Sequence, residues 1–352
     1  MDAPTLPIPA PAFPAPRFFR HDGLRLAYHE SGPEGGEPLI LLHGWPEIAY
    51  SWAPLFPHLA GAGFRVVAPD LRGFGASDAP RAAGAAKSHY SIAQMVGDVE
   101  VLLDHFGLRT ATLVVHDWGG IIGWQAARML GDPAVVEWGR VRRIASISTP
   151  LVREAPVDPL RILERRYGPE HYFLVFNREP EATAELFARD ADAFFRLLMR
   201  TTPPHAQMRA EFAQIPKNVA EYLDAGAPEL PGSVLDADAR ARFVEAYARS
   251  GFHGGIALYR NTTENWELVR GCNGPLTQPA LMVSPERDLF LPPEVTDHMP
   301  EMCRDLERVV LPGCGHWAMW ERPGKLAEVL LEWLARTSPP LPLDGGAGRE
   351  AV

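Results

Sequence analysis

The segment Val114–Gly120, VVHDWGG, constrains the fold of this chain more than any other. An apolar run leads into Asp117, and Gly119 and Gly120 then open a helical pattern that continues to about Leu130. A strand that turns sharply into a helix needs small residues after the turn, because the two backbones approach each other closely there. Such a turn presents one side chain, here that of Asp117, above the edge of a sheet.

Short apolar runs alternate with helical patterns over much of the chain. Residues 18–29 read as two short strands joined at Asp22-Gly23, and Ile92–Phe106 has the apolar spacing of a helix that ends at Gly107. Further strands are predicted at Pro38–His43, Arg65–Pro69, Ala111–Val115, Val141–Ser148, Ala280–Ser284 and Leu306–Leu311. This alternation indicates an α/β fold with a mostly parallel central sheet flanked by helices.

The pattern changes after Pro150, where convincing strands are absent until about residue 269. Helices are predicted within this stretch at Phe187–Met199 and Ala239–Ala248, and another follows the last strand at about Gly324–Ala335. We therefore expect a helical cap inserted into an α/β core. The expected division is a proline-rich arm at 1–17, a first core segment at 18–150, the cap at 151–268, a second core segment at 269–337 and a loose tail at 338–352.

Charge and cysteine content exclude several classes of protein. The 352 residues carry a formal charge of −10, which argues against a nucleic-acid or anionic-membrane partner, since both need a basic face. Three scattered cysteines form neither a disulfide framework nor a zinc site, and no apolar run is long enough to span a bilayer. We expect a cytoplasmic protein with no metal, acting as a monomer or a homodimer.

Three side chains combine into a candidate catalytic set. Asp117 at the turn is either a nucleophile stabilised by the helix N-terminus or an ordinary helix N-cap. His316 lies in LPGCGHW, in a glycine-rich loop after the last predicted strand. Asp288, in VSPERDLFLPP, follows the preceding strand, and Glu286 is the alternative acid. The order nucleophile, acid, histidine is the one expected for this fold.

A fourth element follows the strand PLILLH. The loop HGWPE, His43–Glu47, could supply a backbone N–H to an oxyanion hole, and we assign the two donors to Trp45 and Trp118. His43, Gly44 and Pro46 are expected to shape the pocket beside them. The alternative is a simple strand-ending turn. An ordinary serine or cysteine esterase is disfavoured, because the turn carries neither residue.

Taken together, these motifs resemble the α/β-hydrolase superfamily and, within it, the epoxide hydrolases, over nearly all of residues 18–336. The resemblance rests on HGWPEIAYSW, VVAPDLRGFGASDAP, VVHDWGG, YFLVFNREP and YRNTTENWEL. The last two segments resemble those that carry the family's cap tyrosines, here Tyr172 and Tyr259, with Tyr167 as an alternative to Tyr172. Val115 and Phe173 depart from the family pattern; Val115 should crowd the turn slightly, and Phe173 should alter pocket polarity.

The resemblance implies that an epoxide and water give a vicinal diol without a cofactor. Asp117 would form an ester with the substrate while Tyr172 and Tyr259 act as acids. His316, oriented by Asp288, would activate water. Phenylalanines in the cap hint at an apolar pocket and so at an apolar small-molecule epoxide, although aromatic residues at helical spacing are more often part of a core.

Three other classes of protein would contain some of the same residues. A haloalkane dehalogenase would use Trp118 and Trp45 to stabilise a halide. A haloacetate dehalogenase would want arginines near the nucleophile, where this chain has Trp118. A catalytically silent binding protein would often lack a member of the set Asp117, Asp288 and His316.

Overall fold

The computed structural model describes residues 13–80, 84–130, 139–203, 213–272 and 274–337. In these residues one eight-stranded sheet has the order β1-β2-β4-β3-β5-β6-β7-β8. The strands are β1 (Arg17–His21), β2 (Leu24–Ser31), β3 (Pro38–Leu42), β4 (Arg65–Pro69), β5 (Ala111–His116), β6 (Val141–Ile147), β7 (Ala280–Pro285) and β8 (Leu306–Leu311). Each strand predicted from the sequence is present within one or two residues of its expected bounds.

The sheet is antiparallel at one edge and parallel elsewhere. β1 and β2 form a hairpin whose turn, Asp22-Gly23, has positive φ at both residues, and β2 runs antiparallel to β4. From β4 to β8 every neighbouring pair is parallel. β1 begins at Arg17, the last residue assigned to the arm. The carboxyl ends of the parallel strands therefore share one edge, where open α/β sheets place their sites.

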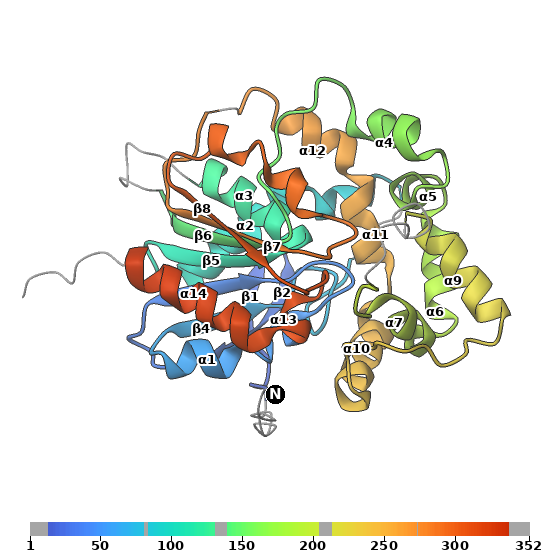
Figure 1. Ribbon diagram of the computed structural model, residues 1–352, viewed down its shortest axis with the longest axis horizontal. Helices are drawn as coiled ribbons and strands as arrows, with labels where there is room; N and C mark the ends of the chain where they lie inside the picture. The colour runs from blue at the N-terminus through green and yellow to red at the C-terminus, as the bar shows by residue number, and fades with distance from the viewer. Residues whose placement is uncertain (1–12, 81–83, 131–138, 204–212, 273, 338–352) are drawn as a thin grey trace, which may run out of the picture.

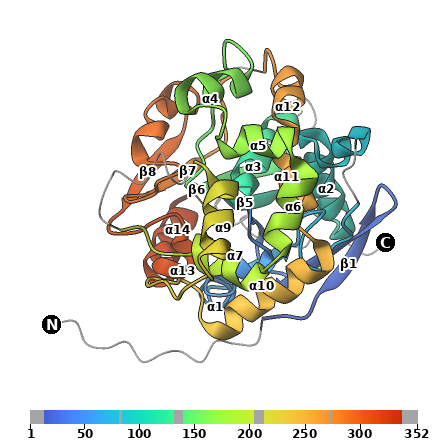
Figure 2. The same cartoon turned by 90° about the vertical axis from the view of Figure 1, so that its right-hand side faces the viewer.

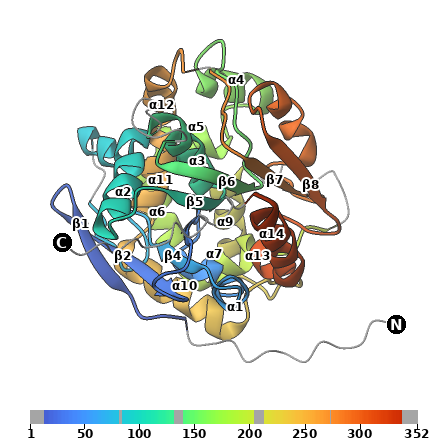
Figure 3. The same ribbon diagram turned by 90° about the vertical axis from the view of Figure 1, so that its left-hand side faces the viewer.

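The middle of the sheet is buried on both faces. In β3, Ile40 and Leu42 join one apolar core while Leu39 and Leu41 join the other, because successive side chains point to opposite faces. The helices of the core are α1 (Phe56–Gly61), α2 (Ile92–His105), α3 (Trp118–Met129), α13 (Ala318–Glu321) and α14 (Pro323–Thr337). α2 and α3 cover one face, whereas α1, α13 and α14 cover the other (Figures 1 and 3).

Between β6 and β7 the chain is helical. The elements there are α4 (Pro159–Tyr167), α5 (Tyr172–Arg178), α6 (Pro180–Ala188), α7 (Ala191–Leu198), α9 (Ile215–Asp224), α10 (Ala237–Ser250), α11 (His253–Arg260) and α12 (Thr262–Leu268). They gather at one end of the sheet and face the viewer in Figure 2. Within the described part of the chain, no helix has the length and apolar character needed to cross a membrane.

One helix prediction was wrong in its extent. The stretch Phe187–Met199 is not one helix, because α6 ends at Ala188 and α7 begins at Ala191. Asp190 lies between them with extended backbone angles, and its side chain accepts a hydrogen bond from the N–H of Ala193 at 2.9 Å. Because Asp190 caps a new helix, the apolar spacing that suggested one helix in fact spans the end of α6 and the start of α7.

The described end of the proline-rich arm is docked on the core. The ring of Phe13 lies 4.6 Å from that of His29, and the carbonyl oxygen of Pro14 accepts a hydrogen bond from His29 Nδ1 at 2.6 Å. Residues 1–12 of the arm and the predicted tail at 338–352 lie outside the described residues.

Candidate active site

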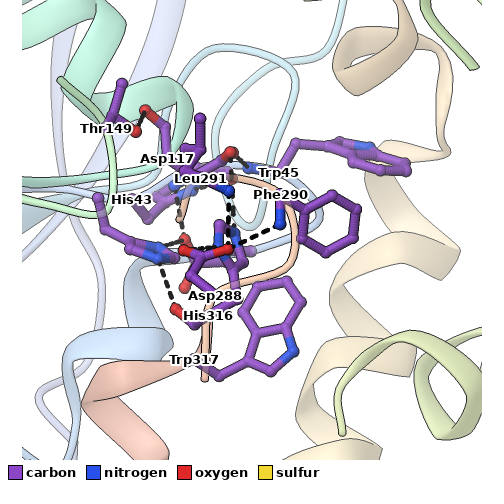
Figure 4. A network of polar contacts seen from close by, with 12 residues as sticks. His43, Trp45, Asp117, Thr149, Asp288, Phe290, Leu291, His316 and Trp317 are labelled. Carbon is purple, nitrogen blue, oxygen red and sulfur yellow. Dashed lines mark hydrogen bonds and ion pairs between the residues drawn. The ribbon is translucent and has the colours of Figure 1, made fainter. Parts of the chain in front are cut away.

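Three predicted residues meet at the carboxyl edge of the sheet (Figure 4). Asp117 follows β5, Asp288 follows β7 and His316 follows β8. His316 Nδ1 lies 2.8 Å from Asp288 Oδ2, and His316 Nε2 lies 3.9 Å from Asp117 Oδ2. The imidazole thus stands between the two carboxylates. Residues far apart in the sequence are adjacent here because parallel neighbours end at the same edge.

The turn at Asp117 has the backbone of a strained strand-to-helix junction. Asp117 has a φ of 50°, and although it precedes α3 its side chain makes no capping hydrogen bond to that helix. A Cβ at Gly119 would lie 2.1 Å from the Leu42 carbonyl oxygen, so only glycine fits there. The crowding expected from Val115 is relieved by Gly123, where a Cβ would come within 2.7 Å of the valine side chain.

The carboxylate of Asp117 lines a cavity and its side chain is 17% exposed. Burial raises its pKa above the ordinary value, while the nearby imidazoles of His316 and His116 act in the opposite direction. Backbone N–H groups of Trp45 and Trp118 also hold the pKa down, and the first of them donates to Oδ1 at 2.7 Å. These are the two donors expected from the sequence. Both donors converge on the carboxyl group of Asp117.

The loop after β3 places one of these donors. His43 is fully buried; its Nδ1 donates to the Gly44 carbonyl oxygen at 2.8 Å, and its Nε2 accepts from the N–H of Leu71 at 3.1 Å. A Cβ at Gly44 would lie 2.3 Å from Asp117 Oδ1. Of the residues expected to line the pocket, Trp45 and Pro46 do so, whereas His43 and Gly44 lie beneath it and support the loop.

Asp288 orients the histidine. Its Oδ1 accepts hydrogen bonds from the N–H groups of Phe290 and Leu291, each at 2.9 Å, which leaves Oδ2 to face His316. Burial alone would raise the pKa of Asp288, but the charge and hydrogen bond of His316 outweigh it and the pKa falls below its usual value. The alternative acid, Glu286, instead accepts the N–H of Gly313 at 2.6 Å.

The electrostatics of His316 depend on both carboxylates. Burial alone would lower its pKa, but Asp288 and then Asp117 raise it, and the balance brings it to about 9. With Asp117 ionised, the histidine therefore carries a proton at neutral pH. Removing the charge of Asp117 removes one of the interactions that keep that proton in place.

A buried acid and a second histidine, which the sequence analysis did not single out, lie under the turn. Glu47 Oε2 accepts the N–H of Gly44 at 2.8 Å and lies 2.7 Å from His116 Nδ1. His116 Nε2 donates to the carbonyl oxygen of His316 at 2.9 Å. Burial would raise the pKa of Glu47, but His116 lowers it below the usual value. The Glu47–His116 pair ties the loop after β3 to the histidine loop.

A second acid that the sequence analysis missed fixes the histidine loop from α13. The carboxylate of Glu321 accepts the N–H of Gly315 at 2.8 Å and that of Trp317 at 3.2 Å. These two residues flank His316 in the chain. The only sequence signal for this role is the short separation between Glu321 and the loop, which many unrelated glutamates share.

The two predicted tyrosines face this site from the helices above it. Tyr172 begins α5 and Tyr259 lies in α11, with their ring centres 5.3 Å apart. Asn177 Nδ2 donates to the carbonyl oxygens of Phe173 and Tyr259, at 2.8 Å and 3.2 Å. This amide fixes one tyrosine-bearing helix against the other, a role the sequence alone did not reveal.

Both tyrosine hydroxyls are held in the protonated form. Burial raises the pKa of Tyr172 and of Tyr259 far above the ordinary value, and the negative charge of Asp117 contributes in the same direction. A hydrogen bond from the Trp118 side chain partly offsets this rise for Tyr259, and one from Tyr259 does so for Tyr172. The two phenols can therefore act as proton donors at the far side of the cavity.

The cavity between core and helices has a volume of about 330 Å³. Asp117 and His316 line it from the core side, and Tyr172, Tyr259 and Phe173 from the helical side. Its size suits a small molecule, and its wall is mainly apolar. Tyr167, the alternative to Tyr172, also borders the cavity but is 38% exposed.

The described residues contain no group of three or more His, Cys, Asp or Glu side chains arranged to hold a metal ion.

Known proteins are similar to this chain in both sequence and fold. A family model described as the alpha/beta hydrolase fold matches residues 37–323. Epoxide hydrolase A of Mycobacterium tuberculosis is 34% identical over 328 residues, which cover 91% of this chain and 97% of that protein. Bifunctional epoxide hydrolase 2 of Sus scrofa is 33% identical over 89% of this chain, but the match covers only 53% of that longer protein.

Solved structures give the same result. The crystal structure of epoxide hydrolase A from Mycobacterium thermoresistibile matches with a TM-score of 0.78 and 30% identity, over 92% of this chain and 99% of that one. An epoxide hydrolase from Vigna radiata matches with a TM-score of 0.76 and 26% identity, over 92% of this chain and 98% of the other. Given the shared fold, the family match and the extent of these similarities, this chain belongs to the α/β-hydrolase fold family and, within it, to the epoxide hydrolases.

Proposed function

We propose that this protein hydrolyses small, mainly apolar epoxides to vicinal diols through an ester of Asp117. The observation that carries the proposal is the arrangement across one cavity: the Asp117 carboxylate lies on one side and two protonated tyrosine hydroxyls lie on the other. An epoxide needs a nucleophile at carbon and an acid at oxygen at the same time. The activity named for the relatives is the one that this arrangement suits.

In the first step the Asp117 carboxylate attacks a ring carbon and the C–O bond of the epoxide breaks. The electron pair moves to the ring oxygen, which takes a proton from Tyr172 or Tyr259. The product is a hydroxyalkyl ester. The buried carboxylate suits this attack, because the cavity offers it little water and its raised pKa makes it a better nucleophile.

In the second step His316 removes a proton from water, and the hydroxide adds to the ester carbonyl carbon. The oxyanion lies at the N–H groups of Trp45 and Trp118. Its collapse expels the diol as an alkoxide, which takes the proton of the new Asp117 carboxyl group, so that the diol and the Asp117 carboxylate are released. Ester formation neutralises Asp117 and so lowers the pKa of His316 from about 9 towards the range of a useful base. His316 then gives its proton to the tyrosine left ionised by the first step, and so becomes a base only after that step.

The remaining expectations from the sequence enter as part of this proposal. Residues 151–268 act as the cap that supplies the acid, and residues 18–150 and 269–337 form the core that supplies nucleophile and base. The cytoplasmic location and the choice between monomer and homodimer stay predictions.

Halide release is the second candidate, and the positions of its two indole donors count against it. The indole N–H of Trp118 is engaged with Tyr259. The ring of Trp45 packs against α11, where a Cβ at Gly255 would lie 2.3 Å from its Nε1. That nitrogen is buried against α11 and has no partner among the described residues.

Isotope labelling tests the covalent route directly. In a single turnover in ¹⁸O-labelled water, the first diol should contain an unlabelled oxygen from Asp117, and label should enter Asp117 as the ester is hydrolysed. Label in that first diol, with none in Asp117 after many turnovers, would refute the proposal.

Two substitutions test the same route. Asp117→Ala should lower turnover by about 10⁴-fold or more, and His316→Gln should let the ester accumulate, which is visible as an increase in the mass of the protein. Chloride or bromide release from haloalkanes, with no diol from epoxides, would favour the second candidate.

A further inference from the structure

A third buried polar side chain lies in the cavity wall beside the two tyrosines. His171 is only 6% exposed, lines the cavity and immediately precedes Tyr172. Its ring stacks between those of Tyr167 and Tyr172, with centre distances of 5.1 Å and 4.8 Å. The mechanism above gives this imidazole no role.

The backbone fixes which nitrogen of His171 carries the proton. Nδ1 lies 3.3 Å from the backbone nitrogen of Phe173, and since a backbone N–H can only donate, Nδ1 must accept. A neutral imidazole has one accepting and one donating nitrogen, so Nε2 carries the hydrogen. Burial lowers the pKa of His171 to about 4, which keeps the ring neutral in this tautomer at ordinary pH.

The donor at Nε2 has no partner among the described residues. Among the other polar side chains of the wall, the indole nitrogen of Trp45 also lacks a partner, but it is packed against Gly255 of α11. Thr149 Oγ1 donates to the carbonyl oxygen of Asp117 at 2.8 Å, and the partly exposed Tyr167 is open to water. An N–H that faces an apolar cavity is hydrogen-bonded only by what enters the cavity, and a bound substrate would supply an acceptor.

We propose that His171 is a substrate-binding residue whose Nε2–H donates a hydrogen bond to a neutral oxygen on the substrate chain, beyond the epoxide ring. This inference rests on the proposed function, because Tyr172 is taken to hold the epoxide oxygen next to it. The preferred substrates then carry an ether, carbonyl or hydroxyl oxygen a few bonds from the ring. A carboxylate is not favoured, since a neutral imidazole cannot balance its charge and Asp117 lies in the same cavity.

A series of oxa analogues tests the preference in the unmodified protein. The reference is 1,2-epoxyoctane, and in each analogue one methylene, at position 4, 5, 6 or 7, is replaced by an ether oxygen. One analogue should show a KM lower by about threefold to tenfold than its neighbours in the series, with kcat little changed, because the contact is remote from the reacting bonds. Equal KM values at all four positions would overturn the inference.

Two substitutions separate the donor from the helix cap. His171→Asn keeps an acceptor near the Nδ1 position, where it can still cap α5, but has no donor as far out as Nε2. His171→Gln places an amide N–H near the Nε2 position and loses the capping acceptor. The oxygen preference should disappear in the Asn variant and persist in the Gln variant. Its persistence in the Asn variant would assign His171 to positioning Tyr172 only.

The controls keep this result distinct from failure of the proposed function. The oxygen preference is measured within each variant, as the ratio of its KM values for the oxa analogue and for 1,2-epoxyoctane. No diol from 1,2-epoxyoctane in the unmodified protein would refute the activity and not the subsite. A measurement without any His171 variant uses the unreactive product diols. The NMR signal of the His171 Nε2–H should shift when the preferred oxa diol binds and stay in place with octane-1,2-diol, and the same shift with both diols would contradict the inference.

Discussion

The core side and the cap side of the cavity are built in different ways. On the core side, Asp117, Asp288 and His316 follow parallel strands, and backbone N–H groups bind both carboxylates. On the cap side, Tyr172 and Tyr259 lie on helices held by aromatic packing and by the amide of Asn177. The core side therefore positions charged groups, and the cap side positions neutral hydroxyl groups. In the mechanism that we propose, the chemistry divides the same way, with the nucleophile and the base on the core side and the acid on the cap side.

Removing the acid from the cap should give the largest effect. Tyr172→Phe and Tyr259→Phe should each slow ester formation by about 10²-fold, and the double variant by about 10⁴-fold, because no donor then remains for the ring oxygen. The burst of ester formation, followed by stopped-flow tryptophan fluorescence, measures this step. Tyr167→Phe is the matched control and should behave like the unmodified protein. A double variant no slower than either single one would show that only one hydroxyl acts.

A steric change on the core side tests how closely the donors must be placed. Gly44→Ala puts a Cβ within 2.3 Å of Asp117 Oδ1, so the loop that carries the Trp45 N–H must shift. The rate of ester hydrolysis should fall by about 10²- to 10³-fold. Gly35→Ala is the control, since nothing lies within 4 Å of a Cβ there. Unchanged hydrolysis in the Gly44 variant, with the fold intact, would remove Trp45 from the oxyanion hole.

The two halves of the reaction should respond differently to pH. Ester formation needs ionised Asp117, whose pKa is raised by burial, so its rate should be level near neutrality and fall as the pH drops through that value. Hydrolysis needs neutral His316, and its rate should rise by about tenfold per pH unit until the pKa of the histidine in the ester is passed. That pKa should lie below the value of about 9 set with Asp117 charged.

Stopped-flow measurement of both rates across the pH range tests whether each rate rises or falls with pH as expected. A hydrolysis rate that falls with rising pH near neutrality would contradict the role of His316 as a base.

The smallest effect is expected at Glu321. Glu321→Ala removes the acceptor for two N–H groups of the histidine loop and should lower the free energy of unfolding by about 1–3 kcal/mol. Glu321→Gln, which keeps one acceptor oxygen, should lose less. Urea unfolding followed by fluorescence measures both. Equal stability of all three proteins would show that water replaces these hydrogen bonds.

Much of this architecture follows from local sequence alone. Each strand predicted from an apolar run is present, because a buried parallel strand needs a short continuous run that few other structures allow. The turn at Asp117 was predictable as well, since only glycine fits where Gly119 meets the Leu42 carbonyl oxygen. The break between α6 and α7 was missed, because Asp190 can sit on a helix surface or cap a new helix, and packing decides between the two.

What the sequence determined by itself was the kind of fold and the chemical groups that the site could use. Each of these groups follows a predicted strand, so the pattern required a sheet whose strands precede Asp117, Asp288 and His316. Only the tertiary structure decided which acid faces the histidine and how Glu47, Glu321 and Asn177 hold the surrounding loops and helices. Those choices depend on distances of a few ångströms between residues remote in the chain, and burial sets the charge of each group only once the chain has folded.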